Sequence, residues 1–136
     1  MKTLIIIPTV GKNIDNLYYE EQVQTLITSI EDNTDEKEYE IFLAVNDYIS
    51  FAYACNLGFS ELLYNPYYRD FDGAAIVTDD MEITDKDWLK KFKNAGIGLV
   101  IQNAAEDQWY AGMGICYLPK QVIEKVGLLD EQFRLL

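Results

Sequence analysis

Short apolar runs alternate with longer amphipathic segments along this chain, and that alternation limits the folds open to it. Residues 3–7, 39–45 and 74–78 are rich in β-branched and other apolar residues, the pattern of strands buried in a sheet. Between the first two runs, residues 15–31 show the periodicity of an amphipathic helix. The order predicts one domain, residues 1–136, with a three-layer α/β/α fold around a mostly parallel central sheet.

Turn and cap residues mark the other expected elements. Pro8 should end the first strand, because proline cannot donate to a sheet ladder. Ser50 is a suitable N-cap for a second helix, which we expect Gly58 to interrupt. The remaining expected elements are a helix over about 84–96, strands over 99–102 and 114–118, and a helix over 119–126 closed by Gly127.

The net charge and the absence of histidine limit the classes of function that fit this chain. A formal net charge of −12 argues against nucleic acid or an anionic membrane as the main partner, while a nucleotide neutralised by a metal stays compatible with it. The chain has no histidine, which excludes Ser-His and Cys-His nucleophile systems. Acid–base chemistry near neutral pH is therefore left to Asp, Glu, Lys, Tyr or Cys.

The apolar residues also bear on where the protein works. No run approaches the roughly 20 apolar residues of a membrane span, and the first apolar run is too short for a signal peptide. Cys55 and Cys116 are far apart in apolar surroundings, which favours buried thiols. We therefore expect a cytoplasmic protein with no integral membrane segment. The tyrosines within 64–68 are candidates for burial against a second copy, and the oligomeric state stays open.

Two adjacent carboxylates, Asp79 and Asp80, follow the apolar run 74–77 after one intervening residue. In open α/β sheets, ligands bind outside the carboxyl ends of the strands. Paired carboxylates at such a place suit Mg²⁺ or Mn²⁺, which shares its coordination shell with phosphate oxygens. The segment therefore suggests a metal-held nucleotide. The alternative is a solvated turn, because aspartate is common in turns.

Five motifs follow one another along the chain. They are Pro8-Thr9, Asn46-Asp47, Ala54-Cys55-Asn56-Leu57-Gly58, Thr78-Asp79-Asp80, and Gly112-Met113-Gly114 followed by Gly127-Leu128-Leu129-Asp130-Glu131-Gln132-Phe133. In this order they resemble a family two glycosyltransferase domain of the GT-A type, including its A-x-N-x-G, D-x-D and G-x-x-D-E-x-F elements. The resemblance extends over nearly the whole chain.

The sequence departs from the family pattern at three functional places, one of which is a late metal-binding histidine that some relatives carry and this sequence lacks. Thr78 stands at the first position of the usual D-x-D motif, so the resemblance assigns metal ligation to Asp80. The family commonly carries its catalytic base in a later Glu-Asp pair, and the sequence ends at Leu136 before such a pair. We therefore expect a minimal or C-terminally curtailed version of the fold.

The resemblance implies a metal-dependent hexosyltransferase. The donor would be a nucleotide-diphosphate sugar, with UDP as the default nucleotide, and the acceptor a hydroxyl of a sugar or another molecule. Mn²⁺ or Mg²⁺ on Asp80 would hold the diphosphate, and transfer would invert the anomeric carbon. The residues expected to bind the nucleotide are Pro8, Thr9, Val10, Asn46, Asp47, Asn56, Thr78 and Asp79.

Inverting transfer needs a carboxylate that accepts the acceptor's proton. Asp130 is the first candidate for this base and Glu131 the second; the alternative is a turn residue followed by a solvated side chain. The acceptor side is assigned to Trp109, Tyr110, Gly112, Met113 and Gly114. The two aromatic residues there either stack on an acceptor sugar or pack in the core.

Other functional classes fit less well. A response-regulator receiver would carry its acidic pair after the first strand, and here that strand ends in Pro8 and Thr9. A dinucleotide-binding domain would need a G-x-G-x-x-G turn at the same place, where only Gly11 stands. The main rival is a non-catalytic module of the same fold, which keeps the nucleotide and metal site and lacks the base.

Overall fold

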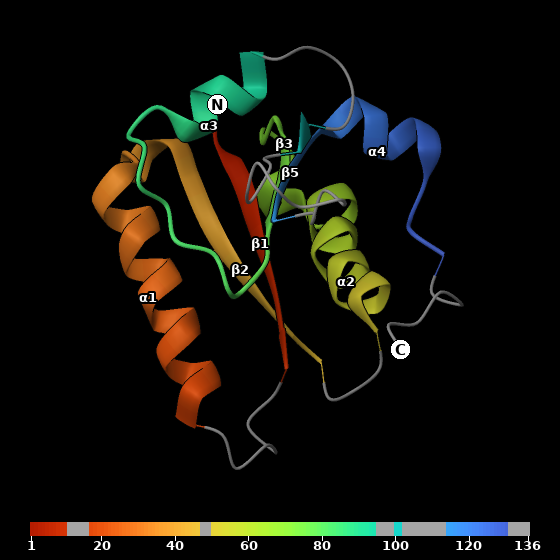
Figure 1. Ribbon diagram of the computed structural model, residues 1–136. Helices are drawn as coiled ribbons and strands as arrows, with labels where there is room; N and C mark the ends of the chain where they lie inside the picture. Colours follow the sequence, from red (N-terminus) through yellow and green to blue (C-terminus); the bar gives the residue numbers. More distant parts are fainter. Residues whose placement is uncertain (11–16, 47–49, 95–99, 102–113, 131–136) are drawn as a thin grey trace.

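The computed structural model describes residues 1–10, 17–46, 50–94, 100–101 and 114–130, and within them the chain forms an open five-stranded sheet flanked by helices (Figure 1). The strands are β1 (Thr3–Val10), β2 (Tyr39–Asn46), β3 (Gly73–Val77), β4 (Val100–Ile101) and β5 (Ile115–Pro119). The helices are α1 (Leu17–Asn33), α2 (Phe51–Tyr64), α3 (Trp88–Asn94) and α4 (Lys120–Val126), with short 3-10 turns η1 (Glu36–Glu38) and η2 (Pro66–Tyr68).

The sheet is mixed, with strand order β2-β1-β3-β5-β4. β1 lies between β2 and β3 and is parallel to both. β5 is antiparallel to β3, and β4 is antiparallel to β5. The predicted α/β class is therefore confirmed, with a sheet that is parallel in one half and antiparallel in the other.

The side chains of β1 divide the core between two faces of the sheet. Leu4 and Ile6 join the cluster beneath α2 and α4, whereas Ile5 and Ile7 join the cluster beneath α1 and α3. All four are fully buried, and burying each is worth about 1.5–3 kcal/mol. Figure 1 shows the resulting layers, with α1 and α3 on one side of the sheet and α2 and α4 on the other.

Three local expectations were wrong in detail. β1 continues through Pro8 to Val10; Pro8 lies beyond Ile6, the last residue paired with β3, where one side of the strand has no ladder. β2 is an edge strand rather than a fully buried one, and Leu43 and Val45 are 42% and 47% exposed.

Gly58 does not interrupt α2, which runs from Phe51 to Tyr64. A Cβ at Gly58 would lie 2.5 Å from Cδ1 of Ile6, so the glycine permits α2 to approach β1 closely. Ser50 caps this helix as predicted, accepting a hydrogen bond from the backbone N–H of Tyr53 at 2.9 Å.

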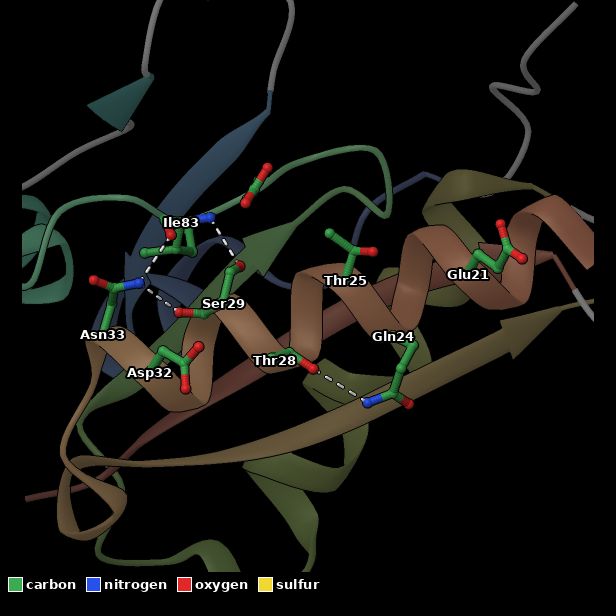
Figure 2. A pocket seen from close by; sticks show the side chains of 9 residues that line it. Glu21, Gln24, Thr25, Thr28, Ser29, Asp32, Asn33 and Ile83 are labelled. Atoms are coloured by element: carbon green, nitrogen blue, oxygen red, sulfur yellow. Dashed lines mark hydrogen bonds between the residues drawn. The ribbon is translucent and has the colours of Figure 1, made fainter.

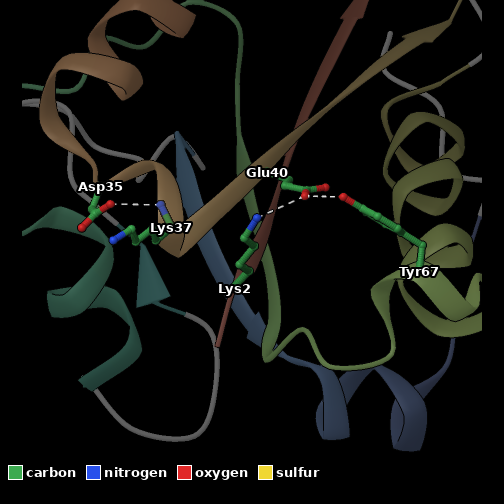
Figure 3. Close-up of polar contacts among 5 residues, drawn as sticks. All are labelled: Lys2, Asp35, Lys37, Glu40 and Tyr67. Atoms are coloured by element: carbon green, nitrogen blue, oxygen red, sulfur yellow. Dashed lines mark hydrogen bonds and ion pairs between the residues drawn. The ribbon is translucent and has the colours of Figure 1, made fainter.

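Polar contacts close the edge of the sheet where β1 and β3 begin. The Asp72 carboxylate accepts hydrogen bonds from Thr3 Oγ1 at 2.7 Å, Lys93 Nζ at 2.6 Å and Tyr117 Oη at 3.3 Å. Nearby, Glu40 on β2 accepts from Lys2 at 3.3 Å and from Tyr67 at 2.6 Å (Figure 3). These contacts join β1, β2, β5 and the residue before β3 to α3 and η2. They lie at the end of the sheet opposite the carboxyl ends of the parallel strands.

No helix among the described residues is long and apolar enough to cross a membrane.

Candidate functional site at the carboxyl edge of the sheet

The path of the chain creates a topological switch point between β1 and β3. From β1 the chain passes through α1 to β2 on one side, and then through α2 to β3 on the other. The two connecting helices therefore cover opposite faces of the sheet, and the switch point lies at the carboxyl ends of β1 and β3. Ligands of open α/β sheets bind in the crevice at such a point.

Thr9 and Asp79 meet at this switch point. Thr9 Oγ1 donates a hydrogen bond to Asp79 Oδ2 at 3.1 Å, which joins the end of β1 to the segment after β3. Thr9 is only 7% exposed and Asp79 is half-buried. Burial raises the pKa of Asp79, the Thr9 hydrogen bond opposes this, and the neighbouring Asp80 carboxylate raises it further. A cation bound here would offset both the cost of burying the Asp79 carboxylate and its repulsion from Asp80.

Thr78 connects Asp80 to the residue that precedes β5. Thr78 Oγ1 donates to Asp80 Oδ1 at 2.8 Å, and the backbone N–H of Thr78 donates to the carbonyl of Gly114 at 2.9 Å. A Cβ at Gly114 would lie 2.7 Å from Met81 Sδ, so the glycine leaves room for Met81 to cover it. Asp80 itself is exposed. The predicted metal ligand and the predicted acceptor-side Gly114 are thus both hydrogen-bonded to Thr78.

Helix α1 fixes the segment that follows the acids. The Ile83 N–H donates to Ser29 Oγ at 2.9 Å, and Asn33 Nδ2 donates to the Ile83 carbonyl at 2.9 Å (Figure 2). Ser29 and Ile83 are both buried. Because β3 holds one end of segment 78–83 and α1 holds the other, the two carboxylates project from a backbone that is fixed on both sides.

A hollow between α1 and this segment adjoins the acid pair. It has a volume of about 220 Å³ and is lined by Glu21, Gln22, Thr25, Asp79, Asp80, Met81 and Glu82. A second hollow of about 540 Å³ along α1 shares three lining residues with it and is lined by Glu21, Gln24, Thr25, Thr28, Ser29, Asp32, Asn33, Glu82 and Ile83 (Figure 2). Nothing in the sequence indicated this hollow, because polar residues at helical spacing opposite an apolar stripe are typical of any solvated helix face.

The donor atoms at the switch point suit a hard divalent cation. Asp79 and Asp80 supply carboxylate oxygens, the ligands that Mg²⁺ takes when it shares its shell with waters and phosphates. Among the described residues no three acidic or cysteine side chains lie close enough to hold a metal. Within the described residues, any metal at Asp79 and Asp80 would therefore need further ligands from outside this acid pair.

The other predicted nucleotide-binding residues differ in whether they lie at the ends of β1 and β2. Val10 and Asn46 are paired in register at the ends of β1 and β2, one pair beyond Thr9 and Val45. Asn56 is 5% exposed, and both ends of its amide bind the backbone of Leu129, so its nucleotide contact stays a prediction.

The acceptor side is described only in part. Asp130 is exposed and follows the residue held by Asn56. The predicted residues that lie outside the described part of the chain are Asp47, Trp109, Tyr110, Gly112, Met113 and Glu131. The contacts that sequence reasoning missed are those of Ser29 and Asn33; a serine and an asparagine on the apolar stripe of α1 were the available signal.

The chain was also compared with known proteins. No protein-family model matches the chain, and no curated protein or solved structure matches it significantly.

Proposed function

We propose that this chain is a metal-dependent glycosyltransferase of the GT-A type, related to family two. It would transfer a sugar, with inversion, from a nucleotide-diphosphate donor such as a UDP-sugar to an acceptor hydroxyl. The observation that carries the proposal is the junction of Thr9, Asp79 and Asp80 at the switch point between β1 and β3. The GT-A assignment also draws on the order of the motifs along the chain, and β5, the strand beside β3, begins directly after the predicted acceptor-side residue Gly114.

Each residue at the junction has a distinct task. Asp80, exposed and oriented by Thr78, would hold Mn²⁺ or Mg²⁺ with Asp79 beside it. The metal would supply neutralisation of the charge that grows on the leaving diphosphate. Thr9 keeps the Asp79 carboxylate facing the end of β1, where the nucleotide would lie along Val10 and Asn46.

The reaction itself is a single displacement. The acceptor oxygen forms a bond to the anomeric carbon while the bond from that carbon to the diphosphate oxygen breaks. The diphosphate leaves with the electron pair, and the acceptor proton passes to a carboxylate, for which Asp130 is the candidate. Water in place of the acceptor would give donor hydrolysis by the same bond changes.

Calorimetry with UDP tests the binding half of the proposal. Affinity should depend on Mn²⁺ and fall by at least about tenfold in EDTA, because the metal offsets repulsion between the diphosphate and two carboxylates. Asp80→Asn should abolish the metal dependence, while Asp87→Asn, an exposed acid beyond the hollow beside Asp79 and Asp80, should leave it intact. Equal UDP affinity with Mn²⁺ and with EDTA would refute the metal role.

Turnover tests the catalytic half. A panel of nucleotide-sugars is incubated with Mn²⁺, with and without sugar acceptors, and released UDP is measured. Release that requires Asp80 supports the transferase. Tight UDP binding without release from any donor would favour the non-catalytic module instead.

A further inference from the structure

The segment after α4 runs back beside α2, in the direction of the end of the sheet that carries the candidate site. The Lys120 N–H donates to the Asp72 carbonyl at 2.9 Å, so α4 begins at the edge where β3 begins. Seven helical residues advance the chain by roughly 10 Å, and Gly127 then ends the helix with φ at 92°. Beyond it, the chain descends beside α2 towards the end where β1 and β2 finish (Figure 1).

Residues 128–130 have little core packing to hold them there. Leu128 and Leu129 are 44% and 39% exposed, and Asp130 is exposed as well. The segment forms neither helix nor strand. Its conformation must therefore depend on specific polar contacts.

Asn56 supplies such a contact on both sides of one peptide unit. Its Oδ1 accepts from the Leu129 N–H at 2.9 Å, and its Nδ2 donates to the Leu129 carbonyl at 2.8 Å. The pairing resembles one rung of a sheet ladder, formed by a side chain 73 residues away. Only an amide offers both a donor and an acceptor in this geometry.

The part of α2 that carries Asn56 is packed tightly against the core. Asn56 lies between Cys55, which is fully buried in the core, and Gly58, whose missing Cβ lets α2 sit against Ile6. Asn56 is itself only 5% exposed. Asn56 therefore fixes the position of the Leu129 backbone, and of the Asp130 backbone that follows it, relative to the core of the sheet.

We infer that Asn56 is a positioning residue that holds Asp130 in place on the acceptor side of the site. This rests on the proposed function for the role of Asp130, while the clamp on Leu129 stands on its own. The acid pair borders a hollow lined by α1 residues, whereas Asp130 follows the residue that Asn56 binds on α2, and these two helices cover opposite faces of the sheet.

The experiment compares the wild type with Asn56→Ala, which removes both bonds, and Asn56→Asp, which keeps the acceptor and loses the donor. Asn65→Ala is the matched control, because Asn65 is exposed at the far end of the same helix and its side chain bonds to Glu61 and Tyr67 near it. The first readout is amide hydrogen exchange at Leu129, with Ile5 and Ile6 as core references.

In Asn56→Ala, exchange at Leu129 should accelerate at least about tenfold while the core references change little. Asn56→Asp should be intermediate, and Asn65→Ala should match the wild type. The second readout is donor hydrolysis with Mn²⁺. In Asn56→Ala its kcat should fall about ten- to hundredfold, with donor KM and UDP affinity within about twofold.

The outcomes separate the two claims. Unchanged exchange at Leu129 in Asn56→Ala overturns the clamp. Faster exchange with unchanged kcat overturns the positioning role, and a matching loss of UDP affinity overturns it in favour of direct nucleotide contact. A wild type that neither binds UDP nor hydrolyses any donor refutes the proposed function, and the exchange data alone then decide whether Asn56 holds the segment. If Asn56→Ala does not fold, Asn56→Asp gives the same comparisons.

Discussion

Two lysines on α3 provide a matched test of what burial does to an ion pair. Lys93 Nζ lies 2.6 Å from Asp72 Oδ2, with the two side chains 24% and 21% exposed. Lys91 pairs with Asp85, where the side chains are 65% and 45% exposed. The lysines are two residues apart on the same helix, and replacing either with methionine changes helix propensity very little.

Lys93→Met should cost far more stability than Lys91→Met. The first change removes a charge-assisted hydrogen bond and leaves the half-buried Asp72 carboxylate with Thr3 and Tyr117 as neutral donors; we expect a loss of about 1.5–3 kcal/mol. The second breaks a solvent-exposed pair, which contributes little to stability because water and salt screen it. For a domain of this size, the difference corresponds to about 5 °C in Tm.

Urea and thermal denaturation followed by circular dichroism measure both losses. Asp72→Asn in the Lys93→Met background should recover part of the stability, since it removes the unpaired charge and keeps an acceptor for Thr3 Oγ1. A loss below about 0.5 kcal/mol in Lys93→Met would refute the reasoning, as would equal losses in the two lysine variants.

Four further predictions rest on individual contacts and on burial. Gly58→Ala should destabilise by roughly 1–2 kcal/mol despite its better helix propensity, because the new Cβ would lie 2.5 Å from Ile6 Cδ1; chemical denaturation measures this, and Ile6→Val should restore part of the loss if the clash is the cause. Burial raises the pKa of Cys55 to about 12 and of Cys116 to about 11 from 9.0, so both thiols should resist a thiol reagent at pH 8 until the protein unfolds; rapid labelling of the native protein would contradict their burial. The folded state keeps these protons where the unfolded chain loses them, so the stability they contribute is complete below pH 9.0 and should decline as the pH rises towards 11; a denaturation series in which Cys55→Ala does not flatten that decline would count against it. Asp79→Asn should raise Tm in EDTA, because burial and Asp80 both disfavour the Asp79 carboxylate, and lower UDP affinity in Mn²⁺; a lower Tm in EDTA would show that the carboxylate stabilises the fold.

Three of the strands could be located from the sequence because each is a short apolar run, although β1 continues past the predicted end at Pro8 to Val10. The runs before Thr9, Asn46 and Thr78 predicted three strands whose carboxyl ends share one edge, and the parallel pairing of β1 with β2 and β3 confirms that arrangement. The direction of β5 was harder to predict. Residues 115–119 are compatible with either direction, since strand polarity is set by the connection and not by the apolar pattern.

Long-range polar contacts were beyond sequence reasoning. The Asn56 amide was interpreted through its motif, and nothing local indicates that its partner is a backbone unit 73 residues away. Gly58 illustrates the same limit, because a glycine within a helical pattern marks either a break or a close approach, and only the position of Ile6 decides between them.

The central claim is that a divalent metal and a nucleotide diphosphate bind at the switch point, and paramagnetic NMR tests it most directly. Substoichiometric Mn²⁺ is added to isotope-labelled protein with and without UDP, and amide signals are followed. The acidic turn Asp35–Glu38 serves as an internal control, since a chain with a net charge of −12 attracts cations non-specifically. We predict that Mn²⁺ with UDP broadens the signals of Thr9 and residues 78–81 first and leaves the control turn sharp. Broadening of the control turn at the same Mn²⁺ concentration, or broadening that UDP does not enhance, would contradict the claim.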